Sequence, residues 1–348
     1  MYFHPLNFLR FILAIGVILF HYGVAYYPFN LPVFKTAILN SSFRVSFFFF
    51  ISGFVMSMVY ATQGKNLKAT FFYKRRFTRI YPVYWLAFLF TLLAVIFLKD
   101  AAPKGLNIIL HGLGGQSLNP GHVLDLNYPA WSISVELIFY LVFPFLLKWM
   151  LNMSIKGLAL TTLLLWMLQS LQHILFVEFI YSGTKMSEEF ISTFPLWHLV
   201  TFFVGMATAR LIALEAFSVF FSKYAMFCLI LTLSTFTYII YVPNPVLKYV
   251  HNGILSPLFM LVLVCLYYDR STLNKFLSNR YVSKLGDVSY GLFIFQYPVW
   301  LVCTWLANPE FIKTNEFFFL YLAILLMFSW LMNRFFEKPL IKNLRAES

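Results

Sequence analysis

Apolar segments of about twenty residues recur along the whole 348-residue chain, and they constrain its fold more than any other feature. A membrane-spanning β-barrel would instead show alternating segments of about ten residues. We therefore expect an all-α, polytopic membrane bundle with about ten transmembrane helices, forming one domain over residues 1–348. The runs long enough to cross a membrane are 6–26, 43–61, 80–98, 131–151, 155–177, 195–214, 222–242, 252–268, 288–307 and 316–336.

The composition agrees with a chain that faces lipid. Hydrophobic residues make up 61% of the chain and charged residues 11%, whereas an ordinary soluble domain has about 25% charged residues. So few charges cannot cover the surface of a soluble enzyme, and so many apolar residues exclude a disordered chain. The three cysteines lie in different apolar runs and form no CxxC pair, which excludes a secreted disulfide scaffold.

The basic residues predict how the chain crosses the membrane. With a cytoplasmic N-terminus, the cytoplasmic segments hold 18 Lys and Arg residues and the segments on the other side hold seven. This bias predicts that both termini are cytoplasmic. The net charge of +13 comes from these flanking residues, so we expect no nucleic-acid partner. The loop 99–130 then lies outside, and its two histidines, His111 and His122, are too weak a pattern to predict a metal site.

Ionisable side chains inside apolar runs are costly and often functional. The first run carries Arg10 and His21, eleven residues apart. At about 100° per residue they share one helix face and are separated by about 16 Å along the axis. The pattern fits a functional stripe. It fits equally an interfacial arginine and a histidine that bonds to a neighbouring helix.

A basic segment, residues 74–79, precedes the third apolar run. Arg76 and Arg79 are three residues apart and share a helix face. Paired guanidinium groups suit phosphate oxygens. The alternative is an anchor that pairs with anionic lipid headgroups.

The fourth run opens with a polar ladder. Ser132, Glu136 and Tyr140 recur every four residues behind Trp131. By residue counting, Glu136 lies about 9 Å and His21 about 8 Å from the outer ends of their runs. We therefore expect the two to be partners, linked directly or through one water. In the alternative, Ser132 and Tyr140 satisfy the carboxylate.

Six motifs in order resemble those of the acyltransferase family 3 membrane proteins, in their stand-alone form. Taken one at a time, the segment with Asp287 and the final Glu-Lys-Pro motif look structural. The matching segments are Leu6-Asn7-Phe8-Leu9-Arg10 with His21, Phe50-Ile51-Ser52-Gly53-Phe54, Arg75-Arg76 with Arg79-Ile80 and Pro82, Trp131-Ser132 with Ser134-Val135-Glu136, Ser289-Tyr290, and Glu337-Lys338-Pro339.

The resemblance implies an enzyme of the bacterial inner membrane that moves an acyl group, most often acetyl, from cytoplasmic acyl-CoA to a hydroxyl of a surface or periplasmic glycan. It implies no permanently bound cofactor, with acetyl-CoA as donor substrate. The expected partners are acyl-CoA, a free or lipid-linked glycan and membrane lipids. Two positions depart from the family pattern: Asn7 replaces a common Asp, and Gln296 replaces a common His.

The resemblance and the residue geometry together give each residue an expected role. Arg10, Arg76 and Arg79 would bind the CoA phosphates at the inner level. His21 would act at the outer level as general base or acyl-carrying nucleophile, oriented by Glu136. The substrate would meet Trp131, Ser132, Tyr140 and Gln296.

Two other functions remain open at this stage. A proton-coupled transporter of small solutes would use His21 and Glu136 as a proton relay. An acyltransferase with a lipid or protein acceptor would keep the same chemistry.

Overall fold

The computed structural model describes residues 3–99, 103–242 and 253–346, and every regular element in these ranges is helical. The α-helices are α1 (His4–Ile18), α2 (Pro32–Leu39), α3 (Arg44–Tyr60), α4 (Ala69–Lys99), α5 (Gly105–Leu113), α6 (Trp131–Leu151), α7 (Ile155–Leu175), α8 (Lys185–Thr193), α9 (Leu199–Ala213), α10 (Ser218–Tyr241), α11 (Ser256–Tyr268), α12 (Thr272–Leu277), α13 (Arg280–Lys284), α14 (Ser289–Leu306), α15 (Pro309–Ile312), α16 (Asn315–Met332) and α17 (Lys338–Ala346).

The polytopic helical bundle expected from the sequence is confirmed. Eight helical segments of the described chain are long and apolar enough to cross a membrane. The remaining two predicted runs, 252–268 and 288–307, correspond to the 13-residue α11 and to α14. Residue 252, where the first of these runs begins, lies outside the described residues.

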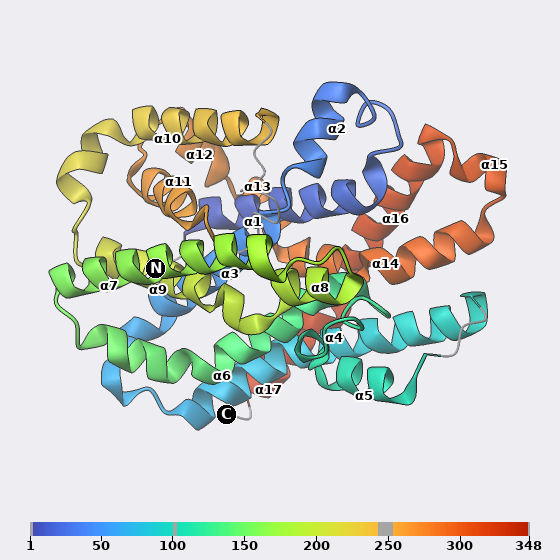
Figure 1. Cartoon of the computed structure of the whole chain (residues 1–348), viewed down its shortest axis with the longest axis horizontal. Coiled ribbons are helices and arrows are strands. Elements are labelled where there is room, and N and C mark those ends of the chain that lie inside the picture. The colour runs from blue at the N-terminus through green and yellow to red at the C-terminus, as the bar shows by residue number, and fades with distance from the viewer. Residues whose placement is uncertain (1–2, 100–102, 243–252, 347–348) are drawn as a thin grey trace.

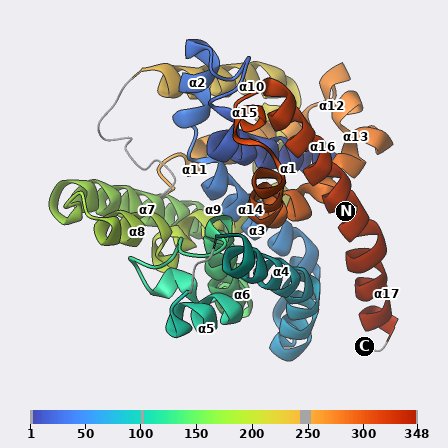
Figure 2. The same ribbon diagram turned by 90° about the vertical axis from the view of Figure 1, so that its right-hand side faces the viewer.

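The helices pack around a central group. Helices α2 and α10 lie along one edge of the molecule, and α4, α5 and α6 lie along the opposite edge (Figure 1). Helices α1, α3 and α14 run between these edges, and the second view agrees (Figure 2). The C-terminal helix α17 extends away from the bundle beyond α16. The central helices are therefore the ones that can carry a buried site.

One glycine pair brings two of these helices together. A Cβ added at Gly53 on α3 would lie 2.0 Å from the Phe202 carbonyl oxygen, and one at Gly205 on α9 would lie 2.0 Å from the Phe50 carbonyl oxygen. Only glycine permits such close backbone contact. The contact fixes α3, which carries Ser52 toward the centre of the bundle.

Helix α4 begins at Ala69, eleven residues before the start of the predicted third span. The prediction followed the apolar run and stopped at the charged segment 74–79. That segment continues the same helix, and Pro82 lies within it. Arg76 and Arg79 therefore lie well inside a 31-residue helix rather than at its end.

In the part of the chain that the structure describes, three helices widen into π-helical turns near their ends, and one of these turns, η5 (Phe176–Ile180), continues α7. The turn η1 (Leu19–Gly23) continues α1 and carries His21. The turn η10 (Asn333–Glu337) joins α16 to α17. A π-helical turn inserts an extra residue, so it changes the direction of the side chains beyond it, and such turns are frequent at functional sites.

Candidate active site

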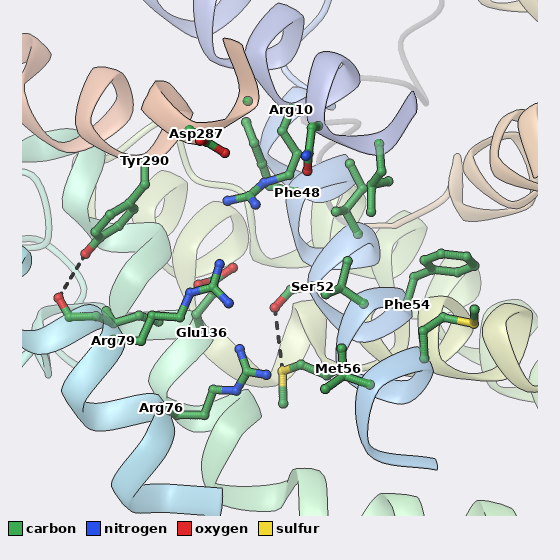
Figure 3. A pocket seen from close by; sticks show the side chains of 18 of the residues that line it. Arg10, Phe48, Ser52, Phe54, Met56, Arg76, Arg79, Glu136, Asp287 and Tyr290 are labelled. Carbon is green, nitrogen blue, oxygen red and sulfur yellow. Dashed lines mark hydrogen bonds between the residues drawn. The ribbon is translucent and has the colours of Figure 1, made fainter. Parts of the chain in front are cut away.

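A cavity of about 420 Å³ lies where the central helices meet. The side chains of Arg10 from α1 and of Arg76 and Arg79 from α4 point into the same space (Figure 3). The sequence placed these arginines together at one level, and the structure brings them into one cavity. The other polar side chains of its lining are Asn7, Ser52, Glu136, Tyr140, Asp287, Tyr290, Asn333, Glu337 and Lys338.

The three arginines have no ion-pair partner. Within the parts of the chain that the structure describes, no carboxylate oxygen lies within ion-pairing distance of their guanidinium nitrogens. Arg76 is only 9% exposed, and its Nε atom is buried without a hydrogen-bond partner. Its guanidinium lies 5.1 Å from the Tyr60 ring centroid. A buried cation that lacks a carboxylate partner is costly unless an anion joins it.

The carboxylates of the cavity are engaged elsewhere. Glu136 accepts a hydrogen bond from the Tyr140 hydroxyl at 2.9 Å. Asp287 forms an ion pair with Lys338 at 2.7 Å, and Glu337 accepts a hydrogen bond from Asn333 at 3.1 Å. The guanidinium groups are therefore left to bind a negatively charged ligand, for which their fork geometry suits phosphate oxygens.

The segment η9 (Leu285–Val288) seats Asp287 beside α1. A Cβ at the neighbouring Gly286 would lie 2.4 Å from the Asn7 carbonyl oxygen, so the two backbones touch. Tyr290, the second residue of α14, donates a hydrogen bond to the Ile80 carbonyl oxygen at 3.2 Å (Figure 3). These contacts fix the wall of the cavity opposite α3.

His21 belongs to a second cluster that does not line this cavity. Its Nδ1 atom lies 2.8 Å from the Oε1 atom of Gln296 on α14. The Tyr128 ring packs edge-on against the imidazole with centroids 4.8 Å apart, and the Tyr128 hydroxyl donates a hydrogen bond to the Tyr22 hydroxyl. Tyr22 in turn stacks on Trp300 at 4.5 Å. The imidazole is thus held by one amide and a group of aromatic rings.

The prediction of a direct hydrogen bond between His21 and Glu136 is wrong: among the described residues, His21 pairs with Gln296 and Glu136 pairs with Tyr140. Two errors in residue counting add up. The first span ends at Gly23 instead of residue 26, which places His21 about 4.5 Å nearer its end. The 3-10 turn η4 (Tyr128–Ala130) precedes α6, which places Glu136 about 6 Å deeper. Glu136 consequently joins the arginines, and His21 bonds to Gln296.

The other residues assigned to the substrate divide between several places. Tyr140 lines the arginine cavity and Gln296 contacts His21. The Trp131 ring packs against His198 and Phe49 with centroids 5.6 and 5.8 Å away. The Ser132 hydroxyl donates a hydrogen bond to the Pro129 carbonyl oxygen at 3.3 Å. The Tyr140–Glu136 part of the predicted ladder is therefore confirmed, whereas Ser132 bonds to backbone instead. The functional roles of these residues stay predictions.

Two carboxylates, Glu189 and Asp125, fasten the loop before α6. Asp125 accepts hydrogen bonds from His122 and Lys185 at 2.7 Å and from Asn107 at 2.9 Å. Partial burial alone would raise the pKa of Asp125, but the hydrogen bonds from Lys185 and His122 hold it below its ordinary value. Burial lowers the pKa of His111 on α5. Among the described residues no group of three His, Cys, Asp or Glu side chains could hold a metal ion.

Several residues of the two sites have no role predicted from the sequence. Asp287 and Lys338 lie far apart in the chain, and their ion pair closes part of the cavity wall. Asp287 lies just before Ser289-Tyr290, and Lys338 lies in the Glu337-Lys338-Pro339 motif; taken alone, both segments look structural in the sequence. Tyr22 and Tyr128, which surround His21, had no sequence signal beyond the proximity of Tyr128 to Trp131 in the chain.

Comparison with known proteins identifies the family of the chain. Residues 3–334 match the model of a family described as an acyltransferase domain. Part of the chain is similar to the acyltransferase MdmB of Streptomyces mycarofaciens, with 33% identity over 120 residues. That match spans 31% of this chain and 30% of the relative, so the chain matches less than a third of that protein's length. No solved structure matches the chain. Because the family model covers nearly the whole helical bundle, the chain belongs to this family of acyltransferases.

Proposed function

We propose that the protein is a membrane-embedded O-acyltransferase that moves an acetyl group from cytoplasmic acetyl-CoA to a hydroxyl of a surface or periplasmic glycan. Its place would be the inner membrane of a bacterium. The observation that carries the proposal is the cavity in which Arg10, Arg76 and Arg79 converge without a carboxylate partner. Membership in the acyltransferase family supports the type of reaction.

The arginine cavity fits the anionic part of the donor. Coenzyme A carries a diphosphate and a 3′-phosphate, and guanidinium groups bind such oxygens with two parallel hydrogen bonds. Glu136 would keep the local charge near balance while its own hydrogen bond goes to Tyr140. We assign Glu136 to this donor site because it lines the same cavity as the three arginines.

His21 fits the chemical step. A neutral imidazole can take the proton of an acceptor hydroxyl while the hydroxyl oxygen attacks the thioester carbonyl. The carbon–sulfur bond then breaks, an ester forms, and the thiolate of coenzyme A leaves and receives the proton. The narrow pantetheine arm would connect the phosphates in the arginine cavity with the thioester at His21.

The test uses the purified protein in lipid nanodiscs with [14C]acetyl-CoA and a glycan extract of the host membrane. We expect label in the glycan fraction with the wild-type protein and none with His21→Asn. Mass spectrometry of surface glycan with and without the gene identifies the acceptor. Transport of acetyl-CoA or of a small solute without ester formation would overturn the proposal.

A further inference from the structure

Two hydrogen bonds fix the orientation of the side-chain amide of Gln296. The residue is fully buried on α14. Its Nε2 atom donates to the Phe293 carbonyl oxygen at 2.7 Å, and its Oε1 atom lies 2.8 Å from Nδ1 of His21. If the amide were turned over, its oxygen would face the carbonyl oxygen of Phe293, and two acceptors would repel each other. The amide oxygen therefore faces His21.

The orientation of this amide decides which nitrogen of His21 carries the proton. A neutral imidazole has one N–H group and one lone pair. An amide oxygen can only accept, so Nδ1 must be the donor. We infer that Gln296 is the positioning residue of His21, which holds the neutral imidazole in the Nδ1–H form and leaves Nε2 as its basic nitrogen. The catalytic meaning of this inference rests on the proposed function.

The helix around Gln296 is shaped to keep this contact. Pro298 has no N–H group, so the carbonyl of Ile294, four residues earlier, lacks a helical partner. The Asn127 side chain donates to this oxygen at 2.9 Å. The Tyr321 hydroxyl donates to the carbonyl oxygen of Gln296 at 3.0 Å. These two hydrogen bonds tie α14 to neighbouring segments, one at Ile294 and one at Gln296 itself.

The same anchor also places an aromatic ring against the imidazole. Asn127 directly precedes Tyr128, whose ring packs edge-on against His21. Because Pro298 has no N–H group, the Ile294 carbonyl is free to accept the hydrogen bond from Asn127. The loop held in this way also carries the Tyr128 ring. With Gln296 on Nδ1 and Tyr128 against the ring, the direction of Nε2 is fixed, as a general base requires.

In the reaction, the proton path follows from this form. Nε2 accepts the proton of the acceptor hydroxyl as the oxygen bonds to the acetyl carbon. The ring is then an imidazolium with a proton on each nitrogen, and the Nδ1 proton stays with Gln296. Nε2 returns its proton to the departing thiolate of coenzyme A, which restores the starting form. Gln296 itself exchanges no proton.

The direct test is ¹⁵N nuclear magnetic resonance of protein labelled in its histidines and reconstituted in lipid. Subtracting the spectrum of His21→Asn isolates the two nitrogen signals of His21, since the chain has seven histidines. We expect a protonated Nδ1 and an unprotonated Nε2 at a pH where the ring is neutral. A protonated Nε2 in the wild-type protein would overturn the inference, whether or not the protein transfers acetyl groups.

Three variants separate positioning from packing. Gln296→Met keeps the length of the side chain but offers no acceptor, so the signals should change to the other tautomer or to a mixture. Gln296→Glu keeps an acceptor facing Nδ1, so Nδ1 should stay protonated, while the negative charge should favour the imidazolium form of the ring. Thr304→Val, on the same helix, removes only a hydroxyl that bonds to the Trp300 and Leu301 carbonyls, and it should change nothing.

Activity gives an independent readout. In Gln296→Met, kcat should fall at least about tenfold while the KM for acetyl-CoA stays unchanged, because a base in the wrong tautomer cannot accept the proton. A wild-type ¹⁵N pattern in Gln296→Met, or the same loss in Thr304→Val, would assign Gln296 to helix packing. Full acetyl transfer by His21→Asn would instead remove His21 from the proposed chemical step and leave the tautomer assignment standing.

Discussion

The arginine cavity and the His21 cluster share helices α1 and α14, yet they are built in opposite ways. The cavity has a volume of about 420 Å³. Among the described residues, its three arginines have no carboxylate within ion-pairing distance, whereas Asp287 is paired with Lys338. The His21 cluster contains one amide and several aromatic rings, and the hydrogen bond that holds the imidazole is made to a neutral group. The first region is suited to binding a polyanion. The second is suited to holding one neutral base in a fixed orientation.

The difference teaches where charge is used in this bundle. Guanidinium groups can stay charged inside a membrane protein when water or an anion reaches them. A general base must instead be neutral before it can accept a proton. A carboxylate beside His21 would favour the charged imidazole, whereas the neutral Gln296 does not. The two regions are therefore expected to respond to substitution in separable ways.

The largest effect is expected at the His21 cluster. His21→Asn should lower kcat for acetyl transfer by about 10²–10⁴-fold, the usual contribution of a general base. The KM for acetyl-CoA should stay near its wild-type value because the proposed phosphate site is the arginine cavity, which His21 does not line. Steady-state kinetics with [14C]acetyl-CoA measure both constants. A variant that kept its kcat would remove His21 from the chemistry.

The next effect is expected at the arginine cavity. Arg79→Lys keeps the charge but loses the planar fork, and it should raise the KM for acetyl-CoA about tenfold with a smaller change in kcat. Arg75→Lys is the matched control, because Arg75 lies on the same helix but does not line the cavity. An equal change in KM in the two variants would show a general effect of arginine replacement on α4 and would contradict a phosphate contact made by Arg79.

A smaller effect is expected at the wall of the cavity. Lys338→Met breaks the ion pair with Asp287, in which both side chains are partly exposed. Exposed pairs contribute about 0–1 kcal/mol, so the KM for acetyl-CoA should change by no more than about fivefold. The same kinetic assay measures it, with Lys342→Met on the same helix α17 as control. A change as large as that of Arg79→Lys would place Lys338 among the main phosphate ligands.

The smallest effect concerns the loop that carries Tyr128 to His21. Because the folded-state pKa of Asp125 is lowered from 3.8, its ion pairs stabilise the folded protein above about pH 4. This contribution is lost as the pH falls through the lower folded-state pKa. Asp125→Asn should therefore lower the free energy of unfolding at pH 7 by about 1 kcal/mol or less, which a lower thermal midpoint would report. The difference from the wild-type protein should disappear under strongly acidic conditions. A difference that grew on acidification would contradict the assignment.

Much of the architecture could be predicted because it depends on local patterns. Each apolar run corresponds to a helix, and Arg76 and Arg79 were placed on one face by their spacing alone. The partner of His21 could not be predicted in this way. Its depth depends on the π-helical turn η1 and on the end of its span, and Gln296 lies 275 residues away in the chain.

The same reasoning explains the position of Glu136. Counting from Trp131 ignored the 3-10 turn that precedes α6, and an error of a few residues along a helix also changes the face on which a side chain lies. Glu136 was correctly expected to need a polar neighbour, and Tyr140 supplies it. The expected neighbour was His21, and Tyr140 was only the alternative that the sequence left open; the cavity that Glu136 and Tyr140 share was not predicted.

Equilibrium binding of acetyl-CoA to protein in nanodiscs tests the separation of the two regions most directly. The wild-type protein, His21→Asn and Arg79→Lys are titrated with [14C]acetyl-CoA under the same conditions. The account predicts that His21→Asn binds with the wild-type Kd and transfers no acetyl group, whereas Arg79→Lys binds about tenfold more weakly. Loss of binding in His21→Asn together with unchanged binding in Arg79→Lys would contradict it.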